Sequence, residues 1–148
     1  MDTQVLRIEK RINADATRLF RAWLNAEDFS QWFLPGIPVE SATLDPRPGG
    51  QFRIDMLLNG KTLPHEGEYR VIEEPTRLVF TWRSHATQGR ETLVTVTFTP
   101  LPQSDLQSGI AKPATLITLT HERLISEEEI KSHRGGWTSI LDCLEKWM

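Results

Sequence analysis

The chain has 148 residues, of which 39% are hydrophobic and 25% charged, and its net charge is −3. This length fits one domain, residues 1–148, whose core needs no disulfide or metal. The composition argues against disorder, and no apolar stretch is long enough to span a membrane. Lys and Arg do not cluster, so nucleic-acid binding is not expected. With no signal-peptide pattern and a single cysteine, Cys143, we expect a cytoplasmic protein.

The amino-terminal segment predicts one strand followed by two short helices. Residues 4–12 alternate between apolar and polar side chains, which is typical of a half-buried strand. Asn13 and Asp15 are residue types that start helices, Asn25 is a second candidate cap, and apolar residues follow at helical spacing. We expect Pro35-Gly36 to end the second helix.

The central part of the chain predicts strands almost throughout. Asn59-Gly60 indicates a type I′ hairpin, Pro64 indicates an edge position or a bulge, and residues 100–113 indicate a mobile hairpin loop. Because the connections resemble hairpins, we expect one antiparallel sheet. Its strands are expected near residues 39–44, 52–58, 64–71, 78–82, 92–99 and 115–122.

The carboxy-terminal segment predicts one long helix. Ser126 and Glu129 have the spacing of a capping box, in which the glutamate reaches back. Apolar residues then recur every three or four positions to the end of the chain, which gives about six turns. The sheet is the large surface against which this helix can bury its apolar stripe, so the predicted class is α+β.

Two adjacent glycines, Gly135 and Gly136, lie inside this predicted helix. Each costs about 1 kcal/mol relative to alanine. Either the helix backbone packs closely against the sheet or the two short helices here, or the glycines form a hinge or a gap that leaves room for a ligand.

The chemistry-bearing residues do not form a known catalytic or metal-binding pattern. The four histidines, His65, His85, His121 and His133, lack metal-ligand spacing. No phosphate-binding loop and no nucleophile–base pair is found. We therefore expect no catalytic residues, no metal and no cofactor. His121 and His133 are either polar anchors of a pocket or hydrogen-bonded histidines of the core.

A pocket is expected between the long helix and the sheet, because a helix across a curved sheet often leaves unfilled space. Trp82 and Trp137 would face each other there, and the alternative is a filled core. The residues expected to line the pocket are Phe80, Trp82, Ile117, Leu119, His121, His133, Trp137 and Leu141.

Several segments resemble the family of the activator of heat-shock protein 90 ATPase, C-terminal-domain type, which belongs to the START-like (SRPBCC, helix-grip) superfamily. They run in order over the whole chain: 19–23 (LFRAW) with Trp32, 45–52 (DPRPGGQF), 67–72 (GEYRVI), 77–82 (RLVFTW), 119–122 (LTHE), and Gly136-Trp137 with Leu141 and Leu144. The resemblance implies a seven-stranded curved antiparallel sheet around the carboxy-terminal helix, with two short helices after the first strand. Our own count of strands and helices agrees.

The resemblance implies several functions. Eukaryotic activators resemble this chain only in their second domain, and the first domain, which engages the chaperone, has no counterpart in these 148 residues. Other superfamily members bind apolar small molecules under the helix, and a few, such as aromatase/cyclases, act on them. We expect non-enzymatic binding of a small apolar or amphipathic ligand, without a cofactor. The alternatives are a protein-interaction module with a chaperone partner in the stress response, or a cyclase- or hydrolase-type enzyme. The sequence leaves the oligomeric state open.

Overall fold

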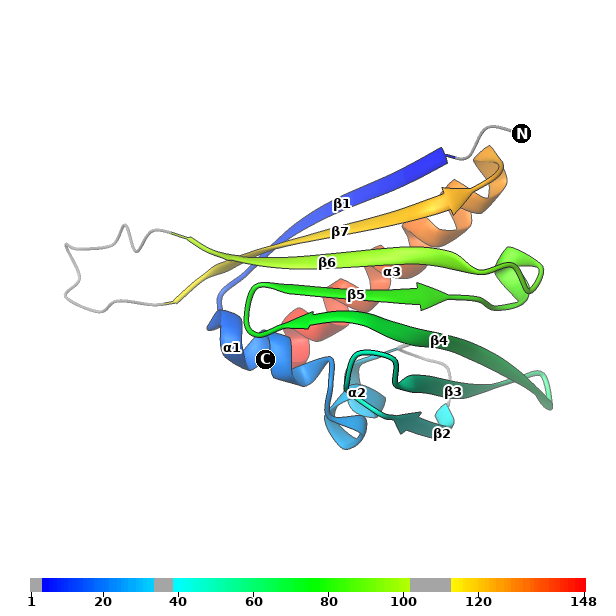
Figure 1. The fold of residues 1–148 in the computed structure, drawn as a ribbon, viewed down its shortest axis with the longest axis horizontal. Coiled ribbons are helices and arrows are strands. Elements are labelled where there is room, and N and C mark those ends of the chain that lie inside the picture. Colours follow the sequence, from blue (N-terminus) through cyan, green and yellow to red (C-terminus); the bar gives the residue numbers. More distant parts are fainter. Residues whose placement is uncertain (1–3, 34–38, 102–112) are drawn as a thin grey trace.

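A computed structural model describes residues 4–33, 39–101 and 113–148 of the chain. Seven strands form one antiparallel sheet in the order β1-β7-β6-β5-β4-β3-β2 (Figure 1). The elements are β1 (Gln4–Ile12), α1 (Ala16–Ala22), α2 (Ala26–Trp32), β2 (Val39–Leu44), β3 (Gln51–Leu58), β4 (Lys61–Glu73), β5 (Arg77–Trp82), the short 3-10 helix η1 (His85–Thr87), β6 (Thr92–Pro100), β7 (Thr115–Leu124) and α3 (Glu127–Trp147). The predicted α+β helix-grip architecture is confirmed.

The long helix α3 runs along one face of the sheet, and α1 lies beside its carboxy-terminal end (Figure 1). Lys10 of β1 connects the strand to this helix, because its Nζ lies 2.9 Å from Asp142 Oδ1 and 3.1 Å from Glu145 Oε1. Helix α2 contacts both β2 and α3, so the two short helices close one end of the space between α3 and the sheet. Within the described residues, no helix is long and apolar enough to cross a membrane.

Strand β4 changes partner along its length, and this change curves the sheet. It pairs with β3 from Lys61 to Glu68 and with β5 from Tyr69 onward, and a further bridge joins Glu66 to Arg83, directly after β5. Gly67 lies at the transition, where a Cβ atom would overlap the carbonyl oxygen of Thr81 and the ring of Phe52. Only glycine therefore fits this close approach of backbones.

The hairpin between β3 and β4 has the predicted two-residue turn. Leu58 pairs with Lys61, and the turn residues Asn59 and Gly60 have φ angles of 52° and 75°. The pairing of β3 with β4 runs without a register shift past Pro64, which faces Asp55. Of the two alternatives for the proline, the edge position is the one found, since pairing on the β5 side starts two residues later, at the bridge between Glu66 and Arg83.

All three helix caps form as expected. The side chains of Asp15, Asn25 and Ser126 each accept hydrogen bonds from backbone N–H groups in the first turn that follows. Glu129 reaches back as predicted, but its carboxylate accepts the N–H of Ile125, 3.0 Å away, rather than that of Ser126. The expected helix stop at Pro35-Gly36 and most of the expected loop at 100–113 lie outside the described residues.

Candidate functional site

A chain of hydrogen bonds connects α3, β7, β6 and β5. It passes through His121 of β7, which is fully buried. The indole Nε1–H of Trp137 donates to His121 Nδ1 at 3.0 Å. An indole nitrogen can only donate, so the neutral imidazole carries its proton on Nε2, which lies 2.7 Å from Thr92 Oγ1. That hydroxyl donates in turn to the carbonyl oxygen of Trp82 at 2.6 Å.

This chain of bonds keeps His121 neutral. Burial, together with the nearby His133, lowers the pKa of His121 to about 3. Protonation would also place a second N–H against the indole N–H of Trp137. Because its side chain is fully buried and both ring nitrogens are already bonded, His121 orients Trp137 and is closed to a substrate.

His133 lies one helical turn before Trp137, and its ring centroid is 4.7 Å from that of His121. Its Nδ1 lies 2.7 Å from the carbonyl oxygen of Glu129. Burial is the main cause that lowers the pKa of His133, so the ring is neutral near pH 7 with its proton on Nδ1. Its Nε2 is buried and has no hydrogen-bond partner among the described residues.

Glu129, at the start of α3, is buried and anchors this part of the helix. Both of its carboxylate oxygens lie 2.6 Å from Arg90 Nη2. Burial alone would raise its pKa, but the hydrogen bonds from Arg90 and from the Ile125 N–H lower it below the usual value. The carboxylate is thus ionised and fully engaged, and it fixes the turn that carries His133.

Between α3, the β3–β4 hairpin, the end of β5 and η1 lies an open hollow of about 280 Å³, which we call the α3 groove. Most of its exposed lining is apolar. The groove is lined by Met56, Leu63, His65, Trp82, Ser84, His85, Ala86, Ser132, His133, Gly136, Trp137 and Ile140. Three of the four histidines therefore meet here, and the fourth, His121, lies behind Trp137.

The two glycines of α3 are not sites of close packing. A Cβ atom at Gly135 or at Gly136 would meet no atom within 4 Å, so the first of the two explanations in the sequence analysis is wrong. Gly136 lines the groove and Gly135 does not. The absence of a side chain at Gly136 therefore widens the hollow beside Trp137.

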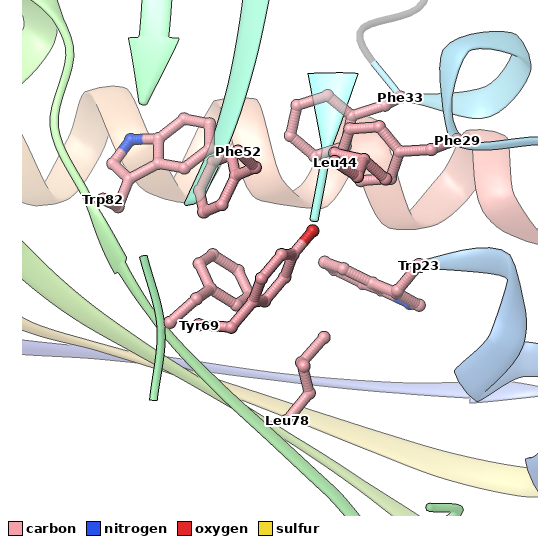
Figure 2. Close-up of a pocket in the computed structure, with 9 residues that line it drawn as sticks. Trp23, Phe29, Phe33, Leu44, Phe52, Tyr69, Leu78 and Trp82 are labelled. Carbon is pink, nitrogen blue, oxygen red and sulfur yellow. The ribbon is translucent and has the colours of Figure 1, made fainter. Parts of the chain in front are cut away.

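A second, much smaller hollow of about 20 Å³ lies deeper, among aromatic side chains of the short helices and the sheet. Figure 2 shows these side chains, with the hydroxyl of Tyr69 pointing in among them. They are Trp23, Phe29, Phe33, Leu44, Phe52, Tyr69, Leu78, Phe80 and Trp82. About 10–15 Å³ suffices for one water molecule, so this space is water-sized and too small for an organic ligand.

The residues expected to line the pocket fall into four places. Trp82, His133 and Trp137 line the α3 groove, and Trp82 also borders the small aromatic cavity together with Phe80. His121 lies behind the groove in the hydrogen-bond chain. The other three are buried in the core at exposures of at most 1%: Ile117, Leu119 and Leu141.

Several groove residues were not anticipated from the sequence, above all Met56, Leu63 and His65. His65 packs against Trp82 with ring centroids 5.3 Å apart, and burial lowers its pKa to about 4. Strand alternation places Leu63 and His65 on the same face as Gly67 and Tyr69, and this was the signal in the sequence that could have located them.

Other hollows at the surface are larger, and each of them includes charged side chains in its lining. One of about 410 Å³ lies over Arg53, Glu66 and Arg83, where Arg83 Nη2 and Glu66 Oε2 are paired at 3.1 Å. Within the described part of the chain, no group of three or more His, Cys, Asp or Glu residues is arranged to hold a metal ion. The α3 groove is thus the best candidate site, because it combines apolar lining with buried polar atoms.

The fold and the groove under α3 define a helix-grip protein. The profile of the family described as "Activator of Hsp90 ATPase homolog 1-like protein" matches residues 13–148. The chain belongs to this family. A comparison with curated proteins finds no match.

Solved structures of similar proteins share the fold over nearly their whole length. An uncharacterised protein from Rhizobium leguminosarum is 24% identical, with 99% of this chain and 94% of that chain covered and a TM-score of 0.75. A protein from Chromobacterium violaceum is 20% identical, with 96% and 95% covered and a TM-score of 0.78. An Hsp90 activator from Plasmodium falciparum is 20% identical, with 96% and 94% covered and a TM-score of 0.72. At these identities the likeness shows the fold.

Proposed function

We propose that the chain is a non-enzymatic protein that binds a small apolar or amphipathic molecule in the α3 groove. The observation that carries the proposal is the groove itself, whose volume of about 280 Å³ is close to the usual range of about 300–1,000 Å³ for ligand sites. Its apolar lining favours an apolar ligand body. The half-buried Cys143 thiol, which forms no disulfide, agrees with a reducing cytoplasm as the place of action.

Two titratable groups beside the groove are unsuited to catalysis. The histidine with the most strongly lowered pKa, His121, is fully buried and bonded on both nitrogens. Glu129 is paired with Arg90. Neither is free to exchange a proton with a bound molecule, as a general acid or base must.

A leucine scan of the two helix glycines tests the proposal. Both positions are open, and leucine favours a helix over glycine by about 0.8 kcal/mol, so both variants should fold. Gly136→Leu places four carbons in the groove, whereas Gly135→Leu, the matched control, projects outside it. We expect calorimetric titration with propylbenzene to show binding by the parent, and Gly136→Leu to weaken it by about tenfold or more.

The control variant shows whether weaker propylbenzene binding comes from filling the groove or from adding a leucine anywhere on α3. Gly135→Leu should bind propylbenzene like the parent. Equal affinities in the parent and in Gly136→Leu, or no binding by the parent, contradict the proposal.

A chaperone-partner role is the second candidate, favoured by the family match and by the structural similarity to the Plasmodium falciparum Hsp90 activator. The exposed apolar side chains give this chaperone-partner role less support. Among the described residues, the exposed large hydrophobic side chains are Val5 and Leu57, on strands β1 and β3 near opposite edges of the sheet, whereas an interaction patch is contiguous. Stimulation of Hsp90 ATPase turnover by the purified chain would favour this second role.

A further inference from the structure

Two buried polar atoms beside the α3 groove lack hydrogen-bond partners in the described part of the chain. They are the indole Nε1 of Trp82 and Nε2 of His133. Their residues are only 5% and 7% exposed, and both line the groove. Buried polar groups in native proteins are nearly always bonded, because leaving one unpaired is costly. Because both residues line the groove, a molecule held there can supply the missing partners.

The two atoms have opposite hydrogen-bonding roles. The indole N–H of Trp82 can only donate. In Figure 2 the indole nitrogen lies on the edge of the Trp82 ring that points away from the other residues of the small aromatic cavity. His133 gives the proton on Nδ1 to the Glu129 carbonyl, so its Nε2 carries a lone pair and accepts.

The remainder of the groove is suited to an apolar body. Met56 and Leu63 come from the β3–β4 hairpin, and Ile140 and Trp137 come from α3. Gly136 leaves the space beside Trp137 open. A molecule lying here would bury apolar surface against both walls and present its polar end to Trp82 and His133.

We propose that the ligand of the α3 groove is a neutral amphipath whose polar head both donates a hydrogen bond to His133 Nε2 and accepts one from Trp82 Nε1, as a hydroxyl or carboxamide does. This inference rests on the proposed binding function. A carboxylate only accepts and would face the lone pair of His133, and an ammonium only donates and would face the N–H of Trp82. A ligand with a charged head group should therefore bind more weakly than a neutral one.

Three probes with one shared body test the head-group preference: 4-propylphenol, propylbenzene and 4-propylbenzoate, titrated calorimetrically near pH 7. A hydroxyl group that enters an apolar site without hydrogen-bond partners weakens binding. If Trp82 and His133 supply these partners, 4-propylphenol should bind at least as tightly as propylbenzene. The benzoate should bind about tenfold more weakly than the phenol. A phenol that binds more weakly than propylbenzene, or a benzoate that binds as tightly as the phenol, would overturn the inference.

Substitution of the acceptor gives the second test. His133→Phe should weaken 4-propylphenol binding by about three- to tenfold, the usual value of one hydrogen bond, and leave propylbenzene binding within about twofold. If the substitution weakens the binding of both probes equally, His133 contributes to the shape of the groove and not a hydrogen bond.

An NMR measurement on the unsubstituted protein remains informative if a variant does not fold. The Trp82 indole ¹⁵N–¹H signal should move downfield with 4-propylphenol and not with propylbenzene. Trp23 is the internal control, since its Nε1 is also buried without a partner but lies at the small aromatic cavity. Identical shifts of the Trp82 signal with both probes would contradict the inference. Binding of neither probe would contradict the proposed function as well.

Discussion

The hydrogen bond from Trp137 to His121 makes a quantitative prediction about stability. Trp137→Phe removes the indole donor and leaves His121 Nδ1 buried without a partner. An unpaired buried acceptor costs about 1–3 kcal/mol, and the smaller ring loses about 1 kcal/mol of apolar burial. We expect the free energy of unfolding, measured by urea titration, to fall by about 2–4 kcal/mol.

The same chemical change at two other tryptophans provides matched controls. Trp23→Phe removes a buried indole N–H that has no partner, so only the loss of about 1 kcal/mol from the smaller ring remains. Trp147 bonds to Gln31 at the surface, and Trp147→Phe should change stability by less than about 0.5 kcal/mol. If Trp137→Phe and Trp23→Phe cost the same, the bond to His121 does not stabilise the fold.

Three further predictions concern the turn, the histidines and the buried ion pair. Gly60→Val should lower the free energy of unfolding by about 1–2 kcal/mol, because a β-branched residue is unfavourable at the φ of 75° found there. An unchanged melting temperature would show that this turn does not stabilise the fold. The pKa values of His65 and His121, about 4 and about 3, lie below the ordinary 6.5, so the unfolded chain binds more protons. Stability should fall by about 2–3 kcal/mol per pH unit from pH 6.5 toward 4; a flat urea midpoint over this range would contradict the burial of neutral rings. Arg90→Met leaves the Glu129 carboxylate without its main partner and should cost about 1.5–3 kcal/mol in urea unfolding, whereas a loss under about 0.5 kcal/mol would show that the pair contributes little.

The parts of the fold that the sequence predicts well depend on neighbouring residues. The caps at Asp15, Asn25 and Ser126 and the turn at Asn59-Gly60 are decided within four residues, and all are found. Helical spacing likewise indicates that Trp137 faces the sheet, where it is buried.

The groove depends on contacts between distant segments, which local patterns do not fix. His65 reaches Trp82 because the neighbouring Glu66 bridges to Arg83 at the end of β5, and this register between two strands is not fixed by a local pattern. The bond between Trp137 and His121 joins residues on different elements. The glycines of α3 were noticed from the sequence, but their role depends on which neighbours surround them, and no atom lies within 4 Å of either Cβ position.

The central claim is that the α3 groove, and no other part of the core, holds the ligand. Methyl-resolved NMR during a propylbenzene titration tests it most directly. The account predicts saturable shifts at Met56, Leu63 and Ile140, which line the groove, and unmoved signals at Ile117 and Leu119, which are buried in the core. Shifts centred on Ile117 and Leu119, or no saturable shift at any of these methyl groups, would contradict it.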